Sequence, residues 1–221
     1  MLLAGFWGLV GGLALVLGAA LGVVRTVPAR VIGLVMAFGA GVLISALAFE
    51  LTAEAFRTSG GREVVLGLLG GALTFYVGDL VLDHRGGQGR KRSGGQQAGA
   101  AAGGLVLGAL LDGIPESVAI GVSLVGGHGV GVAVVAAVFL SNVPEGMSAA
   151  TGLAKAGRSR SWILLLWVGV AVLSAVAAAV GFAVLGGASA SVVAVIQAFA
   201  AGAILTMLAD TMMPEAFENG G

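Results

Sequence analysis

The stretch "AFGAGVLISALAFELTAEAF", residues 37–56, is similar to a second stretch, "AFAAGAILTMLADTMMPEAF", residues 198–217. Both copies open with Ala-Phe and close on phenylalanine, and Glu54 of the first matches Glu215 of the second. The copies belong to the second and seventh apolar segments of the chain, so they cross a membrane in opposite directions. Inverted repeats of this kind are typical of secondary transporters, whose substrate site lies near the bilayer midplane.

The composition indicates an integral membrane protein. Of the 221 residues, 58% are hydrophobic and 10% are charged, and the mean hydropathy is +1.05, whereas a soluble domain carries roughly 25% charged residues. The chain has no cysteine, which excludes disulfides and thiolate metal sites. No basic residue precedes the first apolar run, so we expect a first spanning helix there and not a cleaved signal peptide.

Seven stretches are long and apolar enough to cross a bilayer as helices, which takes about 20 residues each. They are Leu2–Val24, Val31–Leu51, Val64–Leu82, Ala100–Val125, Val130–Leu153, Trp162–Leu185 and Ser191–Met213. We therefore predict an all-α membrane protein with a single transmembrane domain over residues 1–221. The repeat pairs helices 1–3 with helices 6–8 of an eight-helix bundle, and the last helix is absent from this chain, through truncation or as a variant.

Basic residues predict the orientation, because they accumulate in cytoplasmic loops. Nine of the 11 Lys and Arg follow the first, third or fifth stretch, against Arg57 and Arg62 on the other side. We expect a multi-pass protein of the plasma membrane with its N-terminus outside. Residues 84–99, rich in Gly and Gln, are expected to form a flexible cytoplasmic loop, whose basic cluster sets the topology or binds anionic lipid.

Three acids lie well inside the predicted spans. The stretch "LLDGIPESVAIG", residues 110–121, contains Asp112 and Glu116, and "LSNVPEGMSAATG", residues 140–152, contains Glu145. An ionised carboxylate at the helix centre costs roughly 2.5–3.5 kcal/mol even on a lenient scale. No Lys or Arg within a span offers a partner, so we expect these acids to be neutralised, paired or bound to a cation.

The spacing favours a cation. Asp112 and Glu116 are four residues apart on one helix face, as are Ser141 and Glu145, and Asn142 lies one turn away. Pro115 and Pro144 each remove a backbone N–H and free carbonyl groups beside the acids. Carboxylate, amide, hydroxyl and carbonyl oxygens together suit a divalent cation. The competing interpretations are a simple Pro-Glu kink with a protonated acid, and Asn142 as a contact between helices.

The two Pro-Glu elements, together with the inverted repeats, resemble those of the ZIP family of divalent-metal transporters. That family shows His-Asn-x-Pro-Glu-Gly on its fourth helix and a second His-x-x-Pro-Glu-Gly on its fifth. In this chain Asp112 and Ser141 stand in place of the two histidines, and Gly113 stands in place of the first asparagine. The resemblance implies a metal site between the fourth and fifth helices, alternating access, uptake into the cytoplasm and a possible homodimer.

The resemblance names Zn²⁺ as the transported substrate. The missing histidines leave an all-oxygen ligand set of Asp112, Glu116, Ser141, Asn142 and Glu145, which weakens the preference for zinc and admits Mn²⁺, Fe²⁺ or Cd²⁺. Beyond the metal ion and the lipid bilayer, we expect no organic cofactor and no nucleic-acid partner.

Further polar residues could line a metal pathway or simply be solvated helix ends. They are Glu50, Glu54, Asp79, Asp83, His84, Asp210 and Glu215. For Glu54 and Glu215 the two interpretations are equally weighted, and His128 is expected to be a solvated loop residue. Two other functions use the same acids: a proton- or sodium-coupled carrier of another small substrate, and an intramembrane hydrolase. A hydrolase would need a histidine or another general acid within the membrane, and both histidines lie near loops.

Overall fold

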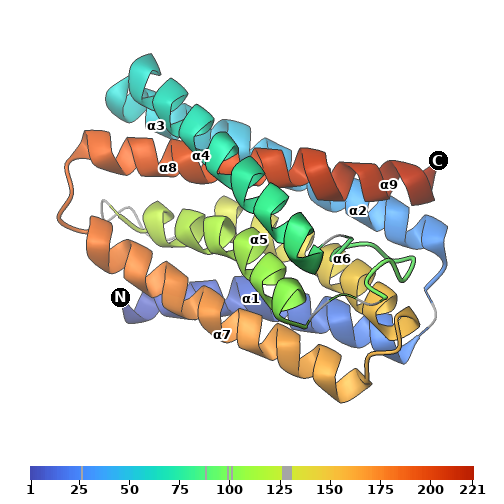
Figure 1. Cartoon of the computed structure of the whole chain (residues 1–221). Coiled ribbons are helices and arrows are strands. Elements are labelled where there is room, and N and C mark those ends of the chain that lie inside the picture. The colour runs from blue at the N-terminus through green and yellow to red at the C-terminus, as the bar shows by residue number, and fades with distance from the viewer. Residues whose placement is uncertain (26, 88, 99, 101, 126–130) are drawn as a thin grey trace.

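The computed structural model describes residues 1–221 except 26, 88, 99, 101 and 126–130, so His128 lies outside the described residues (Figure 1). Every regular element in this described part is helical. The elements are α1 Leu2–Val24, α2 Ala29–Ala46, η1 Leu47–Thr52, α3 Ala53–Ser59, α4 Gly61–Leu82, η2 Asp83–Gly87, α5 Ala102–Ser123, α6 Val132–Lys155, α7 Arg160–Leu185, α8 Ala190–Met207, η3 Leu208–Met212 and α9 Met213–Gly220.

Seven helical spans in the described residues are long and apolar enough to cross a membrane, which confirms the seven predicted stretches. Two of them extend well past their predicted C-terminal ends. The span Ala29–Ser59 comprises α2, η1 and α3, and the span Ala190–Gly220 comprises α8, η3 and α9. Hydropathy alone ended both spans early, because their last turns carry acidic residues that remain helical.

The sequence repeat is also a repeat of the backbone. The π-helical segments η1, Leu47–Thr52, and η3, Leu208–Met212, begin at positions that the repeat makes equivalent. A π segment inside an α-helix is rare and local, so its presence in both copies is a specific likeness. The two long helices run in opposite directions in the bundle (Figure 1), as an inverted repeat requires.

Glycines allow the spans to pack with their backbones in close contact. A Cβ atom on Gly18 of α1 would lie 2.0 Å from the carbonyl oxygen of Val143 on α6, and one on Gly71 of α4 would lie 1.9 Å from that of Phe199 on α8. Such small-residue contacts replace the hydrophobic driving force that is missing between helices in lipid. They hold α1 against α6, and α4 against α8.

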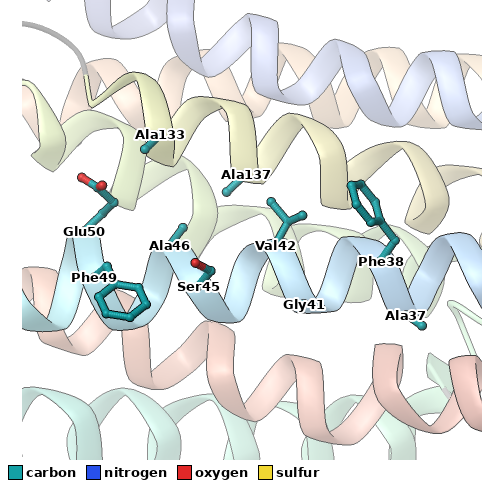
Figure 2. A pocket seen from close by; sticks show the side chains of 10 residues that line it. All are labelled: Ala37, Phe38, Gly41, Val42, Ser45, Ala46, Phe49, Glu50, Ala133 and Ala137. Atoms are coloured by element: carbon teal, nitrogen blue, oxygen red, sulfur yellow. The ribbon is translucent and has the colours of Figure 1, made fainter.

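The matching face of α2 is open. Gly202 of α8 meets the backbone of Leu68, but a Cβ on its repeat equivalent, Gly41 of α2, would meet nothing within 4 Å. A groove lined by α2 and α6 lies there, and Figure 2 shows Phe38, Val42 and Ala137 around it. Apart from Ser45 and Glu50, the residues that line this groove are apolar.

The loops expected on the cytoplasmic side lie together. The connections from α1 to α2, from α4 to α5 and from α6 to α7 lie at the same end of the bundle as the C-terminus of α9 (Figure 1). The basic residues that predicted the orientation therefore gather at one end of the molecule.

Candidate metal site

The predicted site residues lie on two neighbouring helices. Asp112 and Glu116 project from α5, and Asn142 and Glu145 project from α6, each no more than 3% exposed. Glu116 lies close enough to interact with both Glu145 and Asn142. Both helices continue through their prolines, so the acids keep the face that the helical spacing predicted.

Ser141 is placed differently from the other four. Its side chain is fully buried and its hydroxyl donates to the carbonyl of Val138, one turn earlier on α6, at 3.0 Å. A Cβ on Gly39 of α2 would lie 3.1 Å from the Cα of Ser141, so the backbone of α6 at Ser141 lies against α2. The described contacts do not join its hydroxyl to the acids of α5.

Two basic side chains reach the acids from the α4–α5 connection, and sequence reasoning missed them because it considered only Lys and Arg within spans. The guanidinium of Arg90 donates to both oxygens of Asp112, at 2.9 and 3.0 Å, and pairs with Asp79 at 2.6 Å. The ammonium of Lys91 lies 3.0 Å from Oε1 of Glu145 and 3.4 Å from Oδ2 of Asp112. Asp112 and Glu145 therefore have internal cationic partners in this structure.

The predicted flexible cytoplasmic loop, residues 84–99, has buried side chains in its central part. Arg90, Lys91, Ser93 and Gln97 are at most 7% exposed. Polar side chains of α6 hold this segment by its backbone: Ser148 donates to the carbonyl of Lys91 at 2.7 Å, and Lys155 donates to that of Ser93 at 2.8 Å. The segment is thus part of the packed interior.

Glu215 of α9 also binds this segment. Its Oε1 accepts from the backbone N–H of Ser93 at 2.8 Å and from the hydroxyls of Ser93 and Ser148. Glu215 is 1% exposed, so the interpretation as a solvated helix end is wrong for this residue. Its repeat equivalent, Glu54, is exposed and pairs with Arg57 at 3.5 Å, as that interpretation expects.

Burial and nearby charge act in opposite directions on the pKa of Lys91. Burial disfavours an ammonium and lowers the pKa of Lys91, but the carboxylates of Asp112 and Glu145 act against it. The net result is a pKa above the ordinary lysine value. The ion-pair distances thus place the basic side chain of Lys91 among the acids.

Three oxygens around the acids lack a partner. Among the described residues, Oε1 of Glu116, Oδ1 of Asn142 and Oε2 of Glu145 are buried and accept no hydrogen bond. The NH₂ group of Asn142 donates to the carbonyl of Gly11 on α1 at 3.0 Å, which fixes the orientation of its amide. Buried acceptors are nearly always satisfied, so these three oxygens on adjacent helices are available to bind a further group.

The present arrangement does not itself form a compact carboxylate cluster. Within the part of the chain that the structure describes, no three Asp, Glu or His side chains are gathered closely enough to hold one metal ion. The ammonium of Lys91 lies between Asp112 and Glu145 instead. A metal ion bound by both carboxylates would have to replace it.

The predicted pathway acids divide into two groups. The first group lies at the end of the bundle that holds the α4–α5 connection. Asp79 of α4 and Asp83 of η2 pair with the guanidinium of Arg90, and Asp210 of η3 lies near Asp79. A small polar cavity there is lined by Asp83, Asp210, Thr211 and residues 89–92.

The other predicted pathway residues lie apart from this cavity. The imidazole Nδ1 of His84 is 2.7 Å from the carbonyl of Leu80 on its own helix, and the ring is exposed. Glu50 lies at the end of the open groove on α2 (Figure 2). No described contact connects either residue, or Glu54, to the buried acids.

The sequence did contain a signal for the inserted segment. Gly152 of α6 lies directly beneath it, since a Cβ there would lie 1.9 Å from the carbonyl oxygen of Arg92. Gly108 of α5 similarly leaves room for the side chain of Arg90, whose Cδ would lie 2.2 Å from a Cβ at that position. Glycines facing a basic cluster at one end of two acidic helices are the pattern that could have revealed the contact.

Comparison with known proteins gives two matches. The family model described as "ZIP Zinc transporter" matches residues 82–220, more than half of the chain. The Arabidopsis thaliana protein named "Putative zinc transporter At3g08650" is 29% identical over 190 residues, which cover 85% of this chain. The aligned region is 30% of the length of that relative. The family match includes the α4–α5 connection, both acidic helices and the C-terminal repeat.

Proposed function

The chain belongs to the ZIP zinc transporter family, and from this premise we propose that it carries divalent metal ions, zinc foremost, across a membrane through a site between α5 and α6. The proposed ligands are Glu116, Asn142 and Glu145, with Asp112 as a further carboxylate. We further propose that transport runs into the cytoplasm across the plasma membrane. The end of the bundle with the basic loops then faces the cytoplasm.

One observation carries this proposal: the buried and unpartnered oxygens of Glu116, Asn142 and Glu145. An unpaired acceptor in an apolar interior costs roughly 1–3 kcal/mol and more when it is charged, so a ligand that satisfies these three oxygens would stabilise the site. A divalent cation would satisfy all three at once. The nearest alternative for such acids is protonation, which converts one carboxyl oxygen into an O–H donor that can bond to a neighbouring acceptor.

The ligand chemistry supports a broad choice of metal. The site supplies carboxylate and amide oxygens from α5 and α6, and no imidazole or thiolate belongs to the proposed set. Oxygen ligands suit Mn²⁺ and Fe²⁺ as well as Zn²⁺. Ser141, whose hydroxyl bonds to its own helix, is not included among the proposed ligands.

Metal accumulation in cells tests the proposal. Glu116→Gln and Glu145→Gln keep the shape of each side chain but remove its charge, and we expect each to abolish accumulation of ⁶⁵Zn while the protein stays in the membrane. Glu54→Gln is the matched control, because Glu54 is exposed and distant from the site. Wild-type accumulation by both core variants would remove these acids from the mechanism.

Direct analysis of the purified protein separates metal transport from the coupled-carrier alternative. Purified wild-type chain should bind about one Zn²⁺ that Glu145→Gln fails to bind, as measured by equilibrium dialysis. A chain that binds no divalent metal under any condition would favour the coupled carrier.

A further inference from the structure

The segment Gly89–Gln97 enters the interior although it is the most polar part of the chain. Its buried residues, Arg90, Lys91, Ser93 and Gln97, alternate with exposed ones such as Gly94 and Gln96. The amide of Gln97 donates to the carbonyls of Arg90 and Arg92, at 3.1 and 2.7 Å. The segment therefore folds back on itself into a compact turn, and its basic side chains are directed at α4, α5 and α6.

The position of Lys91 is set by the backbone of this segment. Ser148 of α6 binds the carbonyl of Lys91, and Glu215 of α9 binds the N–H of Ser93 two residues later. Neither contact involves the lysine side chain. A neutral residue at position 91 would therefore leave the segment in place and change only the charge that it presents.

The ammonium of Lys91 is a cation, and the acids of α5 and α6 are proposed to bind a metal cation. Its ammonium lies between Asp112 and Glu145, one of which is a proposed ligand and the other an additional carboxylate. Arg90 fixes the neighbouring end by pairing with Asp112 and with Asp79 of α4. Two buried cations beside the site would repel a divalent ion at close range, so the inserted segment and the metal exclude one another.

We propose that the segment Gly89–Gln97 is an autoinhibitory plug, in which Lys91 takes the place of the transported cation and must withdraw before metal occupies the site. This inference rests on the proposed metal function of Glu116 and Glu145. It adds a specific competitor, Lys91, and a holding surface formed by Ser148, Gly152 and Glu215. Withdrawal would free Asp112 and Glu145 to approach a common cation.

The plug predicts that removing its charge tightens metal binding. Lys91→Gln has a chain of similar length and no charge, so we expect the Kd for Mn²⁺ of the purified full chain to fall at least tenfold. Arg85→Gln is the matched control, because Arg85 is exposed on the same connection, and it should leave the Kd unchanged. An equal or weaker affinity of Lys91→Gln overturns the plug.

A second variant displaces the segment without touching any charge. Gly152→Ala places a methyl group where the carbonyl of Arg92 now lies, so we expect it to lift the segment and tighten Mn²⁺ binding as Lys91→Gln does. Gly169→Ala on α7, where a Cβ would meet nothing within 4 Å, is the control for adding alanine to a spanning helix. Unchanged affinity in Gly152→Ala counts against the plug.

Cysteine labelling reports the position of the segment independently of affinity. The chain has no cysteine, so Ala109→Cys provides a single thiol on α5 beside Arg90 and Lys91, and Gln96→Cys provides one on the exposed side of the segment. We expect maleimide to label Gln96→Cys always, and Ala109→Cys only after Mn²⁺ is added or Lys91 is replaced by Gln. Full labelling of Ala109→Cys in the metal-free chain with Lys91 intact overturns the plug.

The two proposals fail in different ways. If the wild-type chain binds Mn²⁺, Glu145→Gln does not, and Lys91→Gln binds no tighter, then the plug is wrong and the metal site stands. If Glu145→Gln binds as well as the wild-type chain in both backgrounds, then the metal site is wrong and the plug falls with it.

Discussion

Arg90→Met tests how strongly the inserted segment holds the bundle together. The side chain of Arg90 is 5% exposed and makes two hydrogen bonds to Asp112 and one ion pair with Asp79. Methionine fills a similar volume and leaves both carboxylates without this partner. Loss of one member of a buried pair typically costs about 3–5 kcal/mol.

The structure favours the lower end of that range. Asp112 retains Lys91 at 3.4 Å, and the side chain of Asp79 is 11% exposed, so neither carboxylate becomes wholly isolated. A loss of about 3 kcal/mol corresponds to a decrease in Tm of about 6–12 °C for a chain of this size. Thermal unfolding of the detergent-solubilised chain, followed by circular dichroism, measures this decrease.

A double variant separates the ion pair from simple packing. Asp112→Asn removes the charge that Arg90 compensates, so Arg90→Met combined with Asp112→Asn should recover at least half of the lost stability. Arg85→Met, on the exposed part of the connection, should leave the Tm unchanged. A decrease below 2 °C in Arg90→Met, or no recovery in the double variant, would refute the structural role assigned to this network.

Three further predictions concern orientation, packing and selectivity. A cysteine at Gln96 should react with an impermeant maleimide only after the cells are opened, and labelling of intact cells would reverse the proposed orientation. Gly18→Ala should lower the Tm well below that of the control Gly169→Ala, because its methyl group would meet the backbone of α6; equal Tm values would contradict the close α1–α6 contact. Asp112→His should shift competition binding from Mn²⁺ toward Zn²⁺, and an unchanged Zn²⁺ preference would show that this position does not touch the metal.

Local pattern was sufficient to predict the spans and the acidic faces. Apolar runs of about 20 residues determine where membrane helices form, and the four-residue spacing of Asp112 and Glu116 places both on one face. The repeat of residues 37–56 also predicted two equivalent helices, and the π segments within them confirm that equivalence. These features depend on neighbouring residues, so the sequence contains them directly.

The partners of the acids depend on contacts between distant segments. Lys91 is 54 residues from Glu145 in the chain and yet lies 3.0 Å from it, and Ser93 meets Glu215 across the entire second half of the protein. Composition predicted a flexible loop for Lys91 and Ser93. Composition shows that these side chains are polar, but it does not show which distant side chains they contact. The hydroxyl of Ser141 likewise has a partner that spacing does not reveal, because it donates to the carbonyl of Val138 on its own helix.

The π segments have a mechanical consequence. A π segment carries one extra residue per turn and is a common point at which a long helix bends. η1 and η3 therefore act as two compliant joints, one in each of the two longest spans, and each divides its span into a long arm and a short one. The short part beyond η3 is α9, whose Glu215 accepts a hydrogen bond from the backbone N–H of Ser93. Bending at η3 would thus move α9, and with it the segment that contains Lys91. The equivalent helix beyond η1 is α3, whose Glu54 pairs with Arg57 of the same helix.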